Sequence, residues 1–177
     1  IWRIVRWHTR RAYGKKTFRL SGKIGIDETS SRKGHNYVSV FVDMKNGEVL
    51  YATEGKDAET VKAFAGELPR HGAEAKQIKE ITMDMSPAFI SGAADHLPEA
   101  SVTFDKFHVV KALNTALDEV RRTEQKQNPL LRKTRYIWLK NPDNLSKSDA
   151  EKLKTLRYEN IRTAKVYQMK LTFQDIY

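Results

Sequence analysis

Three stretches in the first third of the chain alternate apolar and polar residues, the period-two pattern of β-strands. They cover residues 23–29, 37–42 and 48–53, and Lys45-Asn46-Gly47 separates the last two. Asn-Gly between two strand-like runs is typical of a hairpin, because both residues tolerate the positive φ of a type I′ turn. We therefore expect the second and third strands to pair antiparallel.

Helix and strand patterns then alternate along residues 57–128. A helix capped by Asp57 and ended by Pro69 precedes a strand over residues 78–85. Ser86-Pro87 is typical of a helix start, and this short helix ends before Pro98. A fifth short strand covers residues 102–104, and a longer helix runs from residue 107 until Asn128-Pro129 interrupts it.

The chain beyond residue 129 has only helical patterns. A short helix is expected over residues 130–139, and Ser148 with Glu151 has the spacing of a capping box. Apolar residues at helical spacing after this box predict one long helix that continues to about residue 171. Residues 1–12 resemble the end of a basic helix.

The predicted element order is β-β-β-α-β-α-β-α, followed by helices. Three antiparallel strands followed by strand-helix alternation predict an α/β fold with a mixed five-stranded sheet and flanking helices. This is the arrangement of ribonuclease H-like folds, here followed by an all-helical insertion. In such a sheet the first strand is central and the fourth lies beside it in parallel.

The charge distribution predicts two kinds of ligand. The net charge is +10, made of +8 over residues 1–26, −6 over residues 27–105 and +8 over residues 106–177. An acidic middle section suits hard divalent cations, and basic flanks suit a phosphate backbone. Basic helices that are simply solvated would give the same totals.

Composition excludes several classes of protein. The chain has no cysteine, so it cannot form a disulfide framework or a thiolate zinc site. No apolar run approaches the roughly 20 residues that span a bilayer, and no signal peptide is visible, so we expect no membrane partner. The five histidines are too scattered for a zinc site.

Asp27 and Asp84 are the strongest candidates for catalytic, metal-binding carboxylates. They lie on the polar side of the first and fourth strands, which the predicted sheet brings together. Two oxygen-coordinated Mg²⁺ ions roughly 3.5–4 Å apart can activate a nucleophile and stabilise a leaving oxygen in phosphoryl transfer. Alternatively, both residues are strand-end aspartates that pair with lysine or cap a helix. Asp105 is either the N-cap of the helix that follows it or a further metal ligand. Glu28 points to the opposite face of its strand from Asp27 and is expected to form a salt bridge.

Four motifs resemble bacterial insertion-sequence transposases of the ISL3 family. They are Ile24-Gly-Ile-Asp-Glu28, Arg32-Lys-Gly-His-Asn-Tyr37, Ile81-Thr-Met-Asp-Met-Ser-Pro-Ala-Phe89 and Asp105-Lys-Phe-His-Val-Val-Lys111. Together and in this order they are specific, and the resemblance runs from about Lys23 to Tyr177. Trp138-Leu-Lys-Asn-Pro and Tyr167-Gln-Met-Lys-Leu171 resemble the helical insertion of the family.

The resemblance implies an Asp-Asp-Glu active site on a ribonuclease H-like core, with Mg²⁺ or Mn²⁺ in a two-metal site. Asp27 matches the first catalytic and metal-binding aspartate, and Asp84 matches the second. The third acid, a glutamate, is expected beyond Tyr177, which would leave this segment incomplete for catalysis. Asp118 and Glu119 are the nearest acids that could replace it.

The activity implied by the resemblance is metal-dependent DNA cleavage and strand transfer at insertion-sequence ends. Its partners would be double-stranded DNA with terminal inverted repeats and further copies of the chain, in the bacterial cytoplasm at the nucleoid. The alternative is a non-enzymatic DNA-binding module derived from a transposase. Because the chain lacks an initial methionine and stops within a helical pattern, we expect a fragment of a longer polypeptide.

Three segments are expected on this basis. Residues 1–22 would be the basic remnant of an N-terminal DNA-binding region, 23–128 the first part of the catalytic core, and 129–177 a truncated helical insertion. Candidate DNA contacts are Arg32, Lys33, His35, Lys106 and His108, although the loop with Arg32 and Lys33 is equally consistent with simple solvation. Trp2, Trp7 and Trp138 could stack on bases, but tryptophan in a helical stripe is more often part of a core.

Overall fold

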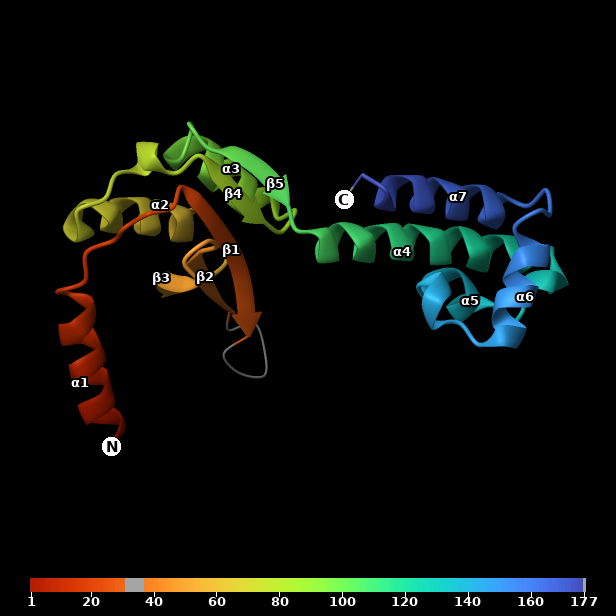
Figure 1. The fold of residues 1–177 in the computed structure, drawn as a ribbon, viewed down its shortest axis with the longest axis horizontal. Helices are drawn as coiled ribbons and strands as arrows, with labels where there is room; N and C mark the ends of the chain where they lie inside the picture. Colours follow the sequence, from red (N-terminus) through yellow and green to blue (C-terminus); the bar gives the residue numbers. More distant parts are fainter. Residues whose placement is uncertain (31–36, 177) are drawn as a thin grey trace. The chain divides into compact units, whose positions relative to one another are not determined.

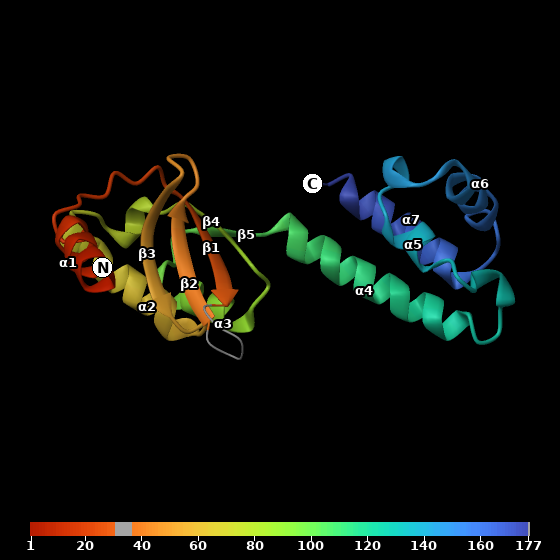
Figure 2. The ribbon, with the colours of Figure 1, turned by 90° about the horizontal axis from the view of Figure 1, so that it is seen from below.

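The computed structural model describes residues 1–30 and 37–176. They form two compact units, Ile1–Asp105 and Lys106–Tyr177, and each is considered by itself. Figures 1 and 2 show a sheet with helices in the first unit and only helices in the second. The expected segment boundaries at residues 22 and 128 stay predictions.

The first unit contains a five-stranded mixed sheet. Its elements are α1 (Trp2–Tyr13), β1 (Lys23–Ser30), β2 (Tyr37–Asp43), β3 (Glu48–Glu54), α2 (Ala58–Glu67), η1 (Leu68–His71), η2 (Ala75–Gln77), β4 (Glu80–Met83), α3 (Pro87–His96) and β5 (Ser101–Phe104). The strand order is β3-β2-β1-β4-β5. The first three strands pair antiparallel, and β4 pairs in parallel with both β1 and β5. The predicted ribonuclease H-like sheet, with β1 central, is confirmed.

The core of this unit lies between one face of the sheet and the helices α2 and α3. Alternate strand residues point into it, so Ile24 and Ile26 of β1 are buried beside Ile81 and Met83 of β4. The helices and the turns after them contribute Val61, Phe64, Leu68, Phe89, Ala93 and Leu97. Burial of these side chains fixes the strand register, because a slip by one residue would turn the apolar set out of the core.

The hairpin between β2 and β3 is confirmed, but its predicted type I′ turn is wrong. Residues 44–47 form the connection, and Gly47 has φ +64° whereas Asn46 does not have a positive φ. The buried Asp43 carboxylate accepts hydrogen bonds from the backbone N–H groups of Lys45 at 3.1 Å and Asn46 at 2.9 Å. These bonds hold the first part of the loop in ordinary negative φ, so only glycine takes the left-handed conformation.

The segment after α1 is anchored to the first unit by stacked rings. The buried His71 ring lies 4.2 Å from Phe18 and 4.5 Å from Tyr13, measured between ring centroids. Its Nδ1 lies 2.6 Å from the carbonyl oxygen of Lys16, and the Phe18 N–H donates to the His71 carbonyl at 2.9 Å. Burial, followed by the nearby Glu67 charge, raises the pKa of Tyr13 to about 12. The residues that follow α1 therefore belong to the packed part of this unit.

The second unit is entirely helical in its described residues. Its elements are α4 (Lys106–Glu124), η3 (Pro129–Leu131), α5 (Arg135–Leu139), η4 (Pro142–Asn144), α6 (Lys147–Leu156) and α7 (Arg162–Gln174). They enclose a separate core that includes Leu117, Trp138, Leu153, Leu156 and Tyr167. Trp138 is fully buried there, as expected for a tryptophan in a helical stripe. None of the helices in the described residues is both long and apolar enough to cross a membrane.

The predicted long helix from residue 148 is wrong, because the chain forms two helices with a break at residues 157–161. The side chain that caps α6 belongs to Ser146, whose Oγ accepts the N–H of Asp149 at 3.1 Å. Glu124, at the end of α4, accepts the N–H groups of Arg162 and Thr163 at 2.8 Å each. This carboxylate caps the start of α7 from 38 residues away, an interaction that periodicity does not reveal.

The hydrogen bonds that the Asp43 carboxylate accepts predict that this residue stabilises the folded chain. The carboxylate also accepts the N–H and Oγ of Ser21, at 2.7 Å each. Burial alone raises the pKa of Asp43, but these hydrogen bonds outweigh burial and hold the pKa below its ordinary value. We expect Asp43→Ala to lower the free energy of unfolding by about 2–3 kcal/mol at pH 7, because charged hydrogen bonds are removed.

Urea unfolding at several pH values tests this role of Asp43. Because its folded pKa is lowered, the stabilisation is present above the unfolded pKa and is lost as the pH falls through the folded value. The difference between Asp43→Ala and the unsubstituted chain should therefore shrink in acid. Asp95→Ala, at an exposed position of α3, is the control. A difference that stays constant down to about pH 2 would contradict this assignment.

Candidate functional site

Asp27 and Asp84 lie next to each other where the parallel pairing of β1 with β4 ends. Asp27 is in β1, and Asp84 directly follows β4. The parallel pairing runs from Lys23 beside Glu80 to Ile26 beside Met83, so the next aligned pair is Asp27 and Asp84. Aligned residues of neighbouring strands point to the same face. Two carboxylates that are far apart in sequence are thus brought onto one face of the sheet.

Each of these carboxylates accepts the backbone N–H of the residue after it. Asp27 Oδ1 accepts the Glu28 N–H at 2.8 Å, and Asp84 Oδ1 accepts the Met85 N–H at 2.5 Å. Asp27 is exposed and Asp84 is half-buried. Both carboxylates therefore keep at least partial access to solvent.

Glu28 has the structural role expected for it. It lies on the same side of β1 as Ile24 and Ile26, and Lys56 Nζ lies 3.7 Å from Glu28 Oε1. The salt bridge predicted for Glu28 is confirmed, and this acid points to the opposite side of β1 from Asp27.

A glycine lies on the sheet face beside Asp27. Gly25 lies two positions before Asp27 and therefore on the same face. A Cβ atom on Gly25 would lie 2.5 Å from Met44 Sδ, closer than real contacts allow. Gly25 thus lets the Met44 side chain lie against the strand. The glycine within the Ile-Gly-Ile-Asp pattern was the available signal for this close approach, because glycine inside a strand often marks one.

The candidate DNA-contacting residues do not join Asp27 and Asp84 in a described site. Arg32, Lys33 and His35 lie outside the described residues. Lys106 and His108 belong to α4 in the second unit, so their position relative to Asp27 and Asp84 is not defined.

Asp118, a candidate replacement for the third acid, is buried in the second unit. Its Oδ1 lies 2.8 Å from Arg121 Nη2, and its Oδ2 lies 3.4 Å from Arg135 Nε. Glu119, its neighbour on α4, is exposed. Within residues 1–30 and 37–176, no group of three or more histidine or carboxylate side chains is arranged to hold a metal ion.

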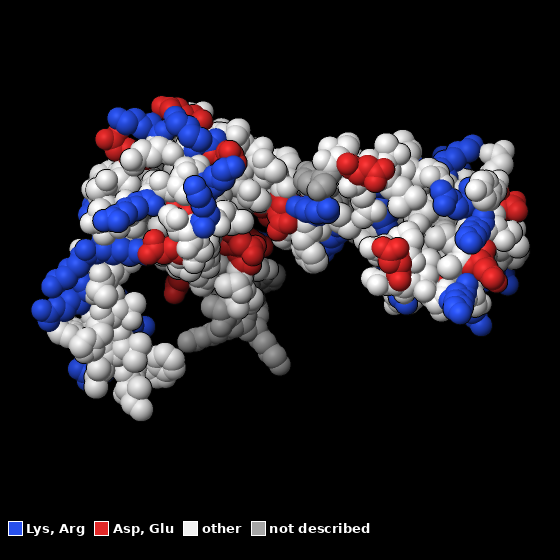
Figure 3. All heavy atoms as spheres, in the orientation of Figure 1, with Lys and Arg blue, Asp and Glu red and all other residues white. Residues whose placement is uncertain are grey.

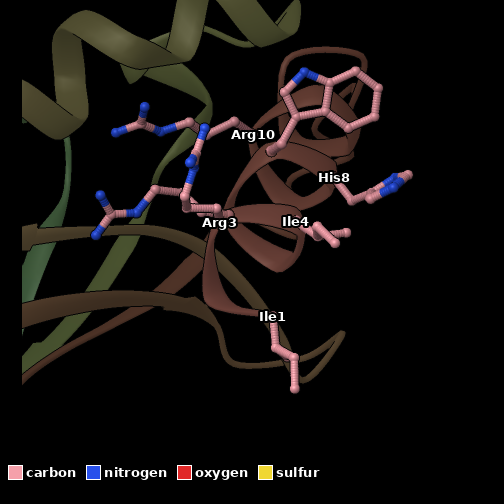
Figure 4. A pocket seen from close by; sticks show the side chains of 7 residues that line it. Ile1, Arg3, Ile4, His8 and Arg10 are labelled. Atoms are coloured by element: carbon pink, nitrogen blue, oxygen red, sulfur yellow. The ribbon is translucent and has the colours of Figure 1, made fainter.

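The helix α1 carries an arginine-rich surface. Arg3, Arg6 and Arg10 follow each other at helical spacing on an element without a buried residue or an acid. Figure 4 shows Arg3 and Arg10 extending to one side of the helix, and these arginines line a surface hollow of α1. In Figure 3, basic side chains gather on and beside this helix. Trp2 and Trp7 are exposed on the same element, at 84% and 54%.

A family model described as "Transposase", that of the ISL3 type of DDE transposases, matches residues 24–177. The chain belongs to this transposase family. The match includes the first unit from residue 24, the whole second unit and all four motifs that carried the resemblance, so the predicted family is confirmed.

Curated members of the transposase group agree with this assignment. The transposase of insertion sequence element IS1001 from Bordetella parapertussis is 30% identical over 93% of this chain and 44% of its own length. The transposase of IS1557 from Mycobacterium tuberculosis is 28% identical over 88% of this chain and 41% of its own length. The chain therefore spans less than half the length of these relatives.

Solved structures similar to this chain include the catalytic core domains of two integrases. The catalytic core domain of HTLV-2 integrase, in complex with magnesium, matches with a TM-score of 0.37 and 16% identity. That alignment covers 82% of this chain and 91% of the integrase chain. The BIV integrase catalytic core domain gives a TM-score of 0.37 and 16% identity over 88% of this chain and 97% of its own.

The proximity of Asp27 and Asp84 predicts a stability effect. Like charges on aligned strand positions repel, so Asp27→Asn or Asp84→Asn should raise the free energy of unfolding of the metal-free chain by up to about 1 kcal/mol. Urea unfolding in the presence of a chelator measures this, with Asp95→Asn on α3 as the control. If both variants are instead less stable, the two aspartates act as caps or ion-pair partners.

Proposed function

We propose that this chain provides the two aspartates of a DDE transposase active site, which catalyses metal-dependent DNA cleavage and strand transfer at insertion-sequence ends. The observation that carries the proposal is the β1–β4 register, which places Asp27 beside Asp84 on one sheet face. Membership in the transposase family supplies the reaction class.

The donor set fits a hard divalent cation such as Mg²⁺ or Mn²⁺. Such cations prefer oxygen ligands, and both side chains are carboxylates, of which Asp27 is exposed and Asp84 half-buried. When bound, a pair of such cations would activate the attacking oxygen and stabilise the departing one in an in-line displacement. The two-metal arrangement follows the family and belongs to the proposal.

The residues of the chain have distinct tasks in this scheme. Asp27 and Asp84 would hold the cations, and the buried neighbours Ile26 and Met83 fix the register that keeps these two positions adjacent. Glu28 points to the other face of β1, where Lys56 pairs with it.

The proposed partner is double-stranded DNA that carries the terminal inverted repeats of the element, bound by more than one copy of the chain. Arginine contacts to phosphate position a protein on DNA without reading its sequence. We assign this role to Arg3, Arg6 and Arg10 of α1, and retain Arg32, Lys33, His35, Lys106 and His108 as candidate contacts. The proposed location is the nucleoid in the bacterial cytoplasm.

Substitution of the two aspartates tests the catalytic assignment. In the transposase polypeptide that contains this chain, Asp27→Asn or Asp84→Asn should reduce strand cleavage by about a thousandfold or more, because cation charge stabilisation worth several kcal/mol is removed. DNA binding should change little, since the phosphate contacts remain. Gel assays of cleavage and binding measure both, with Asp95→Asn as the control. Cleavage at the unsubstituted rate by either variant would refute the assignment.

Salt dependence tests the DNA contacts of α1. We expect the 177-residue chain to bind duplex DNA with little sequence preference and an affinity that falls steeply as salt rises. The triple change Arg3→Gln, Arg6→Gln and Arg10→Gln should reduce the slope of log K against log salt by about 0.9 for each phosphate that these arginines neutralise.

A matched control for this experiment removes three lysines that pair with glutamates. Lys62, Lys76 and Lys79 lie 3.0, 2.6 and 2.6 Å from glutamate oxygens, and their replacement by glutamine removes the same charge. An equal effect of both triple variants would show that net charge, and not the α1 surface, binds the DNA.

A further inference from the structure

The second unit contains a hollow of about 410 Å³ beside α4 and α5, two helices that pack against each other (Figure 1). One face of α4 lines this hollow from Phe107 to Arg122, which is almost the whole helix, and Arg135 of α5 lines it as well. That run of α4 is about 22 Å long, at 1.5 Å per residue. The hollow is therefore an elongated surface feature within a single unit.

Three cations lie in the lining of the hollow. Lys111 and Arg122 of α4 are exposed, and the Arg135 side chain is 55% exposed. Of the two acids in the lining, Asp118 is buried and lies 2.8 Å from a guanidinium nitrogen of the neighbouring Arg121, and Glu119 is exposed. Positive charge thus exceeds negative charge here, as a phosphate backbone requires.

The side chain of Asn114 adds a hydrogen-bond acceptor that the fold does not use. Asn114 lines the hollow, and its Oδ1 is hidden from solvent without a hydrogen-bond partner in the described part of the chain. A hidden acceptor without a donor is unfavourable. A ligand that brings an N–H group to this oxygen would therefore bind more tightly.

An aromatic ring begins the same face of α4. Phe107 lines the hollow and is 68% exposed. It precedes Lys111 by one helical turn, and Lys111 precedes Asn114 by another, so the three side chains share one face. An exposed ring among cations is a surface on which nucleobases stack. The row combines a stacking ring, an acceptor and phosphate-binding cations.

These three features together fit an unpaired DNA strand better than a duplex. Unstacked bases offer their flat faces to aromatic rings and the N–H groups of their pairing edges to side chains, whereas both are occupied within a duplex. We propose that the hollow binds an unpaired segment of a DNA strand. One base stacks on Phe107, a base N–H donates to Asn114 Oδ1, and the phosphates contact the cations. This inference rests on the proposed function, which supplies DNA as the ligand.

Fluorescence anisotropy with a labelled single-stranded oligonucleotide tests the proposal on the 177-residue chain. We expect Phe107→Ala to bind this strand about tenfold or more weakly, because stacking on the ring is lost. An abasic strand with the same sugar-phosphate backbone should bind Phe107→Ala and the unsubstituted chain equally. Tyr158→Ala, at a ring of the same unit that is 85% exposed, is the control and should affect neither strand.

The acceptor and the cations have separate expected effects. Asn114→Ala should weaken binding of the strand with bases and leave the abasic strand unaffected. The double change Lys111→Gln and Arg122→Gln should reduce the slope of log K against log salt on both strands, by about 0.7 for each phosphate contacted. Lys152→Gln with Lys154→Gln, at exposed positions of α6, removes the same charge. An equal loss of slope in both double variants would mean that net charge alone attracts the strand.

Water that simply fills the hollow is the competing explanation. In that case Phe107→Ala would bind both strands as the unsubstituted chain does, and the inference would be overturned. It would also be overturned if this change weakened both strands equally. The proposed function would stand in either case, because cleavage by the Asp27 and Asp84 variants tests it separately. Should Phe107→Ala fold poorly, Phe107→Leu gives the same comparison, because leucine keeps apolar bulk without a ring.

Discussion

The parallel pairing of β1 with β4 is the constraint on which the rest of the site depends. Ile24 and Ile26 are buried beside Ile81 and Met83, and this contact with the helices α2 and α3 allows only one register. The position after Ile26 and the position after Met83 are then neighbours, whatever residues occupy them. A site made of Asp27 and Asp84 is therefore positioned by the apolar side of the sheet.

The acids of this protein differ in how their charge is compensated. Asp43 accepts two hydrogen bonds from the hairpin loop and two from Ser21, and Glu124 caps α7 through two backbone N–H groups. Burial raises the pKa of Glu124, but its hydrogen bonds to Thr163 and Arg162 outweigh this and lower it. These carboxylates stabilise the fold with donors built into it. Asp27, by contrast, is exposed and accepts the N–H of its own neighbour, an arrangement suited to an external cation.

The sequence predicted those features that depend on local alternation and on chain order. Strand patterns placed Asp27 and Asp84 on adjacent strands, because a central first strand follows from the order of elements. Features set by contacts distant in sequence were missed. The break before α7 depends on Glu124, 38 residues earlier than Arg162, and helical periodicity carries no information about such a cap.

The exposure of the aspartates reconciles a charged site with a stable sheet. A carboxylate that is fully buried without a partner would cost several kcal/mol. Asp27 lies within β1, which continues beside β2 to Ser30, but it is exposed, and Asp84 and Asp105, which directly follow β4 and β5, are only half-buried. Repulsion between them is then screened by water, and the fold tolerates it. The same accessibility allows a hydrated cation to reach the carboxylates, so the feature that lowers the cost of the site also permits its proposed use.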